Sequence, residues 1–283
     1  KASQITRAVF GQGTRDEDKL GAGVARQYGK GEDGFQISSC QFAMHYFFEN
    51  AKSVHSFLRN ITECTKVGGY YVGTCYDGRT VFDALYKKKK EESITIFKSD
   101  RKIYEITKMY DQTGFADDET SLGYPINVYQ ESINKTFVEY LVNFDYFNRV
   151  MQAYGFEVIS REEANEAGLP EGSGLFSELF INMLDEISKN KFKSKEYGLA
   201  PNMSRTDKKI SFLNRYFVYK KVRTVNTEAI QLELGEYNET EALRNAVETK
   251  NAQTVAKEEV AKVKPKDRKI SKKSKYKNKK LSD

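Results

Sequence analysis

Two short segments decide the fold: FQISSC at residues 35–40 and YYVGTC at residues 70–75, both of them prone to form strands. Between them, residues 51–65 repeat apolar side chains at helical spacing, and Gly68-Gly69 is expected to end that helix. A strand, a helix and a second strand make one βαβ unit, which implies two parallel neighbours in a single sheet. The sequence therefore predicts an α/β fold.

After this unit the pattern changes to alternating strands. Asp77–Leu85 is expected to be a short helix, and the three segments that follow alternate apolar and polar residues. These segments are Ile94–Phe97, Ile103–Tyr110 and Tyr124–Ile133. We interpret them as an antiparallel meander inserted after the second strand of the parallel sheet.

The next part of the chain returns to mixed helices and strands. Residues 137–154 carry an apolar stripe typical of an amphipathic helix, and residues 155–159 follow as a strand. A second helix is predicted at residues 175–190, and Ile210–Val222 is expected to close the sheet as its last strand. The predicted domain therefore spans residues 35–222.

The two ends of the chain differ from this domain in composition. Residues 1–34 are rich in glycine and charge, and we interpret them as a long surface loop. Residues 223–262 are rich in Glu and Ala and are expected to form a helical appendage. Residues 263–283 are predicted to be a disordered basic tail, because they hold too little apolar surface to fold.

Charge is distributed unevenly along the chain. Of the 46 basic and 40 acidic residues, 11 basic and 2 acidic ones lie in residues 262–283, which leaves 35 basic and 38 acidic residues for the rest. The net positive charge of the chain therefore comes from its tail. The tail is either a solvated end or an arm that binds a polyanion such as RNA.

Several classes of protein are excluded or disfavoured. Apolar runs are far shorter than a membrane span and the mean hydropathy is −0.67, so no membrane association is expected. No leader opens the chain, and three scattered cysteines indicate reduced thiols, so we expect an intracellular protein. With two histidines ten residues apart and no paired cysteines, no metal site is expected.

The end of the first strand is the first place to expect a ligand. In open parallel sheets, ligands bind beside the carboxyl ends of the strands, and Gln41 to Tyr46 directly follow such an end. Amide, imidazole and phenol groups together suit a planar ligand that forms hydrogen bonds. The alternative is that His45 and Tyr46 only cap the strand through local hydrogen bonds.

A set of motifs then resembles one enzyme family. The run SCQFAMHYFFE at residues 39–49 resembles the signature of mRNA cap (guanine-N7) methyltransferases. It is followed in family order by FLRN at 57–60, GGYYVGT at 68–74 and FVEYLV at 137–142. The closing YFVY at 216–219 is similar to the final strand of the family. These matches cover about residues 35–222 and are similar above all to capping enzymes of large DNA viruses.

The resemblance implies a cofactor and a fold. The fold is a partial Rossmann-like class I methyltransferase sheet, and the cofactor is S-adenosylmethionine. The family places Gln41 and Tyr46 against S-adenosylmethionine, with the backbone near Phe42 alongside the adenosine. Guanine N7 has a free lone pair and the sulfonium methyl is already activated, so no general acid or base is expected.

The same resemblance implies a site for the cap guanine. His45 and Glu139 hold the base, and Tyr216 packs near it. The N1–H and 2-amino groups of guanine are adjacent donors that one carboxylate accepts together. Without the motif, Glu139 is equally an acidic residue in the first turn of the helix predicted at 137–154, and Tyr216 is equally a core aromatic.

One family feature is missing from the sequence. No glycine-rich loop after a first strand is recognisable before Phe35, so we interpret the chain as a fragment, half of a split enzyme or a degenerate module. We expect the chain alone to bind S-adenosylmethionine weakly and to be inactive. The predicted function is methyl transfer to guanine N7 of the mRNA cap, with capped mRNA and other capping domains or subunits as partners. The alternatives are a non-catalytic subunit that binds RNA or a partner protein, and a methyltransferase for another acceptor.

Overall fold

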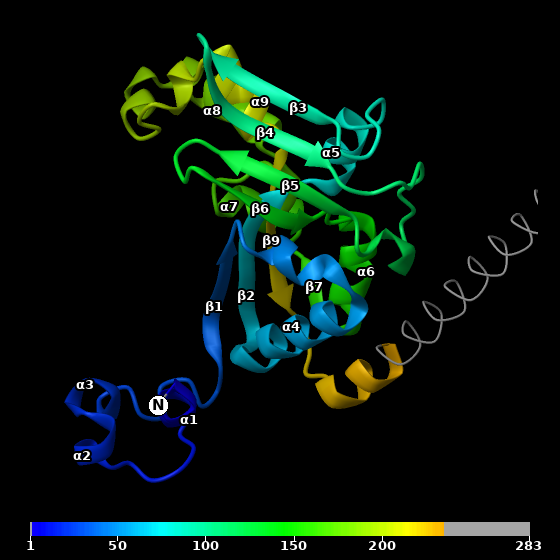
Figure 1. The fold of residues 1–283 in the computed structure, drawn as a ribbon. Coiled ribbons are helices and arrows are strands. Elements are labelled where there is room, and N and C mark those ends of the chain that lie inside the picture. The colour runs from blue at the N-terminus through cyan, green and yellow to red at the C-terminus, as the bar shows by residue number, and fades with distance from the viewer. Residues whose placement is uncertain (1, 235–283) are drawn as a thin grey trace, which may run out of the picture. The chain divides into compact units, whose positions relative to one another are not determined.

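A computed structural model describes residues 2–234 of the chain. Its larger sheet is mixed, with strands in the order β1-β2-β9-β7, and β8 pairs with β9 beside this path (Figure 1). The bounds are Phe35–Gln41 for β1, Thr65–Tyr76 for β2, Phe156–Val158 for β7, Ser173–Leu175 for β8 and Asn214–Lys221 for β9. β1 and β2 are parallel and are joined by α4 (Ala51–Cys64), which confirms the predicted βαβ unit.

The boundary between α4 and β2 differs from the prediction. Asn50 caps α4, because its side chain accepts a hydrogen bond from the Ser53 N–H at 2.9 Å, and the helix ends at Cys64. β2 starts at the next residue, so Gly68-Gly69 lies within the strand and does not end the helix. Gly69 has a different role, because a Cβ there would come within 2.9 Å of the carbonyl oxygens of Phe35 and Gln36. Glycine therefore allows β1 to approach β2 closely.

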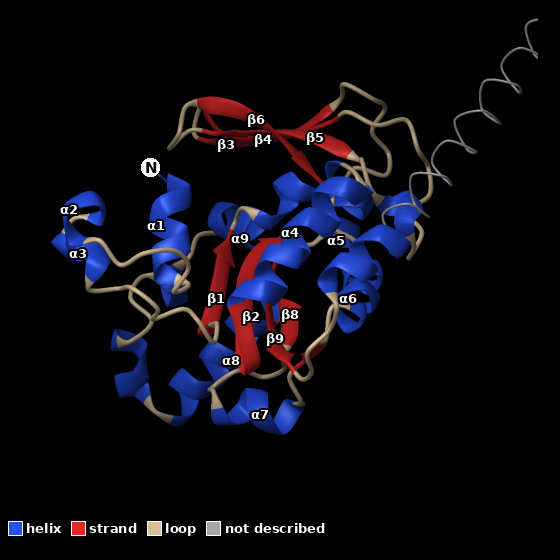
Figure 2. Ribbon diagram, turned by 90° about the horizontal axis from the view of Figure 1, so that it is seen from below, coloured by secondary structure: helices blue, strands red, loops and turns tan. Residues whose placement is uncertain are grey.

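A second sheet is fully antiparallel and follows α5 (Gly78–Ala84). Its strands are β3 (Ser93–Lys98), β4 (Arg101–Lys108), β5 (Pro125–Gln130) and β6 (Lys135–Tyr140), paired in chain order. The predicted meander is therefore confirmed, with β6 as an additional fourth strand. Figure 2 shows this sheet lying across one end of the larger sheet.

The helix predicted at residues 137–154 is wrong in its first third. Lys135–Tyr140 pairs with β5 as strand β6, and α6 (Phe144–Ala153) begins only after Asn143. The reason is that Asn143 caps the helix: its side-chain oxygen accepts hydrogen bonds from Asp145 N at 3.0 Å and Tyr146 N at 3.2 Å. Glu139 consequently lies on a strand and not in the first turn of a helix.

Helices cover both faces of the larger sheet. α4 and α6 pack on the face that carries Tyr71 and Tyr219, which forms the main core. α7 (Arg161–Glu166) lies on the opposite face, where its Glu163 accepts hydrogen bonds from Tyr70 and Lys220. A second core forms between α5 and the antiparallel sheet.

The chain between β7 and β9 contains more helix than predicted. α8 (Phe176–Lys189) confirms the predicted helix at 175–190. It is followed by two short 3-10 helices, η3 (Lys191–Lys195) and η4 (Ala200–Asn202), and by α9 (Arg205–Ser211). Ser204 and Asp207 form a capping box that starts α9, and this helix includes Ile210. The last strand therefore begins at Asn214 and not at Ile210.

The prediction of a long loop at residues 1–34 is wrong. This part contains the helices α1 (Ala2–Val9), α2 (Glu17–Leu20) and α3 (Ala22–Ala25). The hydroxyl of Tyr28 donates to the Gly11 carbonyl at 3.0 Å, and the Gly29 N–H donates to the Ala8 carbonyl at 2.9 Å. Glycines form turns next to these helices: Gly11 follows α1 and Gly29 follows α3, and both adopt the left-handed region.

After β9, residues 227–234 are helical and contact α4. The hydroxyl of Thr227 donates to Glu63 at 2.7 Å, and Ile230 packs against the main core. The rest of the predicted appendage and the predicted basic tail lie outside the described residues. Within residues 2–234, no helix is long and apolar enough to span a membrane.

Candidate functional site

A cavity of about 660 Å³ lies between the two sheets. Its walls come from the residue that follows β1, from η1 (Met44–Glu49) and from the last residue of β2. They also come from β4, β5 and β6 of the antiparallel sheet, from α8 and α9, and from the first residue of β9. The polar and aromatic residues of the wall that matter most for recognition are His45, Tyr46, Tyr76, Tyr104, Glu139 and Asn214. The volume falls in the range of small-molecule sites.

His45 and Glu139 face each other in this cavity. Nε2 of His45 lies 3.3 Å from Oε2 of Glu139, and the two side chains are only 4% and 7% exposed. Neither of these atoms forms a hydrogen bond with any described residue, and the same holds for Nδ1 of His45. Apart from the contact between Nε2 and Oε2, these three atoms have no polar partner among the described residues. Buried polar atoms that form no hydrogen bond are costly and rare, so the three atoms can bind a polar ligand.

Burial sets the charge of both groups. It lowers the pKa of His45 to about 4, so the imidazole is neutral at pH 7. It raises the pKa of Glu139 from 4.5 to about 7, because the buried carboxylate loses its hydration. A neutral imidazole offers one donor and one acceptor, and the carboxyl group changes charge near neutral pH.

The position of Glu139 follows from the pairing of β6. Glu139 stands opposite Ile126 of β5, and alternation along the strand directs Phe137 and Glu139 to the cavity. The intervening Val138 is 52% exposed on the other side. Beyond the strand, the N–H of Gly78 donates to the Val142 carbonyl at 3.0 Å and so connects the end of β6 to α5.

A pair of tyrosines in the wall was not predicted. The hydroxyl of Tyr104 donates to that of Tyr76 at 2.7 Å, and the Tyr76 ring stacks near His45 with centroids 6.2 Å apart. Burial raises the pKa of Tyr76 to about 12, so it stays protonated. Tyr76 is the last residue of β2, just as Gln41 is the last residue of β1, and this position is the signal that would have identified it.

Asn214 is a second residue that the sequence did not reveal. It pairs with Tyr76 across β2 and β9. Its side-chain amide donates to the carbonyls of Ile210 at 3.3 Å and Ser211 at 3.0 Å, which fixes its orientation. Its Oδ1 is buried and accepts no hydrogen bond from the described residues. No local pattern identifies Asn214, because its role depends on the end of α9.

The residues predicted to bind the cofactor lie at the end of β1. Phe42 and Tyr46 line the cavity and are 52% and 44% exposed. Gln41 does not line it; its side chain accepts a hydrogen bond from Thr74 at 2.8 Å and donates to Ser39 at 3.0 Å. An exposed aromatic ring and an amide at the carboxyl end of a parallel strand fit the adenosine of S-adenosylmethionine.

Tyr216 lies outside the cavity wall. It is 5% exposed, and its hydroxyl donates to the Glu171 carbonyl at 2.9 Å. The structure therefore brings His45 and Glu139 together, as predicted, but gives Tyr216 the surroundings of a core aromatic. Contact between Tyr216 and a bound base stays a prediction.

Known proteins resemble this chain in sequence. It is 27% identical over 226 residues to a "Probable mRNA-capping enzyme" of Acanthamoeba polyphaga mimivirus, a match that covers 68% of this chain and 18% of the relative. It is 25% identical over 142 residues to an mRNA cap guanine-N(7) methyltransferase of Aspergillus niger, covering 50% and 22%. The chain thus spans less than a quarter of the length of these two relatives.

Among solved structures, the CcbJ methyltransferase from Streptomyces caelestis matches with a TM-score of 0.36 and 10% identity, over 68% of this chain and 59% of that one. The family model of the mRNA (guanine-N(7))-methyltransferase domain matches residues 10–222, a range that contains β1 to β9 and the whole cavity. That match covers well over half of the chain, which therefore belongs to the mRNA (guanine-N(7))-methyltransferase domain family.

Proposed function

We propose that this chain transfers a methyl group from S-adenosylmethionine to guanine N7 of the mRNA cap and holds the guanine in the cavity between His45 and Glu139. The observation that carries this proposal is the set of three buried polar atoms of these two residues that form no hydrogen bond with the described residues, in a cavity with aromatic walls. Capped mRNA is the proposed substrate. Other capping domains or subunits are proposed partners.

The chemistry of guanine fits these groups. The N1–H and 2-amino group are donors on one edge of the base, and the Glu139 carboxylate accepts from both. O6 on the same edge accepts the N–H of neutral His45. The rings of Tyr76 and Phe137 provide apolar surface for the faces of the base. Adenine lacks both donors and should therefore bind more weakly.

The chain aligns the reactants and moves no proton in this proposal. S-adenosylmethionine, when bound, supplies a methyl group that is already activated by its sulfonium. Phe42 and Tyr46 are the residues that would hold it at the cavity, with Gln41 beside them at the end of β1. Guanine N7 has a free lone pair, so positioning and exclusion of water are the contributions left to the protein.

Discrimination between GpppG and ApppA tests the proposal, because ApppA contains no guanine. We expect GpppG to bind at least about tenfold more tightly, since adenine leaves Glu139 without its two donors. Isothermal titration calorimetry measures both affinities. Methyl transfer is then followed with radiolabelled S-adenosylmethionine at a concentration well above its dissociation constant. Equal affinity for the two caps, or label on an atom other than N7, would contradict the proposal.

Cap binding is expected to strengthen with rising pH. Only the ionised form of Glu139 accepts both guanine donors, and with a pKa of about 7 roughly a tenth of it is ionised at pH 6. His45 is neutral and Tyr76 is protonated throughout this range, so neither adds a pH effect. The affinity for unmethylated GpppG should therefore be about tenfold lower at pH 6 than at pH 8. The control is Glu139→Gln, for which titrations at both pH values should agree.

A further inference from the structure

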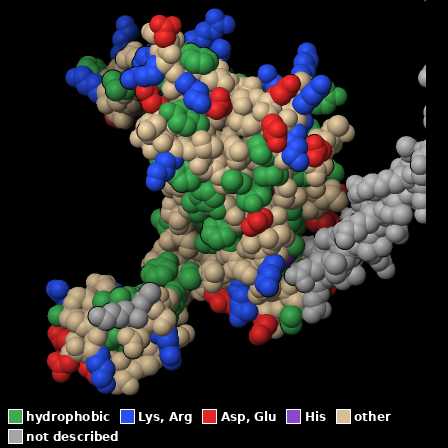
Figure 3. All heavy atoms as spheres, in the orientation of Figure 1, with side chains coloured by type: hydrophobic (Ala, Val, Ile, Leu, Met, Phe, Trp, Pro, Cys, Tyr) green, Lys and Arg blue, Asp and Glu red, His purple; other side chains and the backbone are tan. Residues whose placement is uncertain are grey.

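The segment between the end of α8 and α9 concentrates positive charge. Residues 189–209 contain seven basic and two acidic residues, whereas residues 1–261 as a whole contain 35 basic and 38 acidic ones. The other residues of 1–261 therefore carry a net negative charge. Figure 3 shows Lys and Arg side chains gathered at the end of the molecule where Figure 1 places α8 and α9. We call residues 189–209 the basic segment.

The basic segment adjoins the cavity. Two of its residues, Met203 and Asp207, line the cavity wall, as do Ile210 and Ser211 immediately after it. α9 also contacts β3, whose last residue is the exposed Lys98. A ligand that leaves the cavity on this side therefore passes along the basic segment.

Part of this charge is not neutralised. Lys189 pairs with Asp185, and Lys193 pairs with Glu186 at 2.8 Å. In contrast, Lys191, Lys195 and Arg205 are exposed and form no ion pair with any other residue in 2–234. These three cations are available to an external anion.

Exposed apolar side chains lie among these cations. Phe192 is 79% exposed and stands between Lys191 and Lys193 in the chain, and Leu199 is 85% exposed. Basic residues interleaved with an exposed aromatic ring are typical of surfaces that bind single-stranded RNA, where phosphates meet the cations and a base stacks on the ring.

We propose that the basic segment binds the first nucleotides of the RNA behind the cap, with Lys191, Lys195 and Arg205 on phosphates and Phe192 under a base. This inference rests on the proposed function, because a guanine in the cavity is attached to a polyanionic chain that must leave it. An acidic protein is the less favoured ligand of the basic segment. The RNA is covalently joined to the guanine in the adjoining cavity, whereas a separate protein has no such connection.

The test compares a short and a long ligand in two variants of the full chain. K191A/K195A/R205A should bind a capped 20-nucleotide RNA about tenfold more weakly at low salt and should bind GpppG as well as the wild type does. Three lost phosphate contacts should also reduce the slope of log K against log salt by about 2. Phe192→Ala should weaken RNA binding without changing that slope. The matched control is K52A/K87A/K89A, three exposed lysines outside the basic segment.

Each outcome decides the inference. Unchanged RNA affinity in the triple variant, equal loss for RNA and GpppG, or loss in the control variant would each overturn it. Competition by polyglutamate as effective as that by uncapped RNA would show an acidic protein surface instead. If the wild type binds capped RNA with the expected slope but does not bind GpppG, the proposed function fails and the RNA surface stands.

Discussion

Replacing Glu139 with alanine should lower the affinity for GpppG about 100-fold or more and should at the same time raise the thermal stability. The loss reflects two hydrogen bonds to a carboxylate, each with a typical contribution of about 1.5–3 kcal/mol. The gain in stability arises because this carboxyl group is buried without a hydrogen-bond partner for Oε2, and its pKa is raised to about 7.

The raised pKa of Glu139 determines how the stability change depends on pH. Glu139 has a higher pKa in the folded protein than in the unfolded one, so its stabilising contribution is present below pH 4.5 and is lost as the pH rises toward 7. Above pH 7 the buried carboxylate costs on the order of 3 kcal/mol. The stability difference between Glu139→Ala and the wild type should therefore grow with pH across this window.

Calorimetry with GpppG and melting curves at pH 5 and pH 8 measure both effects, and ligand-observed NMR measures S-adenosylmethionine binding. S-adenosylmethionine binding should be nearly intact in Glu139→Ala. Glu157→Ala, an exposed glutamate on β7, should behave as the wild type in every assay. A variant that melts earlier and loses both ligands equally would show that Glu139 supports the fold and does not recognise guanine.

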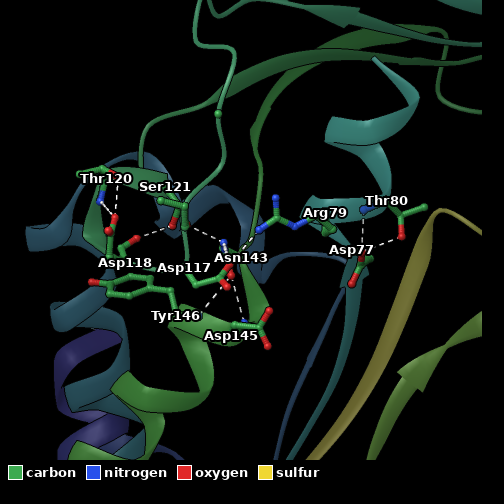
Figure 4. Close-up of polar contacts among 12 residues, drawn as sticks. Asp77, Arg79, Thr80, Asp117, Asp118, Thr120, Ser121, Asn143, Asp145 and Tyr146 are labelled. Atoms are coloured by element: carbon green, nitrogen blue, oxygen red, sulfur yellow. Dashed lines mark hydrogen bonds and ion pairs between the residues drawn. The ribbon is translucent and has the colours of Figure 1, made fainter. Parts of the chain in front are cut away.

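The second large effect is expected at Asn143, which joins three parts of the chain (Figure 4). Its side-chain oxygen caps α6, and its amide donates to the Ala116 carbonyl at 2.8 Å and to Asp117 at 3.0 Å. Arg79 of α5 bonds to the same Asp117 carboxylate at 2.8 Å. Asn143→Ala loses the cap and two further hydrogen bonds, each of which contributes about 1 kcal/mol, and should cost about 3 kcal/mol in total.

Urea unfolding at pH 7 measures this cost, and a matched control exists in the same chain. Ser160 caps α7 in the same way, through a hydrogen bond from Glu163 N at 3.1 Å, but in an exposed position. Ser160→Ala should therefore cost no more than about 1 kcal/mol. Similar losses for Asn143→Ala and Ser160→Ala would mean that the contacts of Asn143 with Ala116 and Asp117 contribute nothing.

Local patterns were sufficient for some elements and not for others. The unit β1-α4-β2 was predicted because each of its elements has its own hydrophobic period. Residues 137–140 were predicted as helix because Phe137, Leu141 and Phe144 also fit a helical spacing, and only the pairing with β5 makes this stretch a strand. Strand pairing depends on residues far away in the sequence, so the spacing of apolar residues within one segment does not reveal it.

The site shows the same division. His45 and Glu139 were identified through the family motifs, and the structure brings them together. Tyr76 and Asn214 were missed, because their meeting depends on the register between β2 and β9. The free Oδ1 of Asn214 depends further on where α9 ends. A motif therefore locates residues that a family shares, and coordinates are needed for those that complete the pocket.

The helix at residues 227–234 changes where the domain should be considered to end. The family match stops at residue 222, yet Ile230 covers part of the main core and Gln231 bonds to Ser56 of α4 at 3.2 Å. The segment shared with the family therefore ends before the segment that packs into the core of this domain. A recombinant version trimmed to the shared region would lose a piece of its own hydrophobic interior.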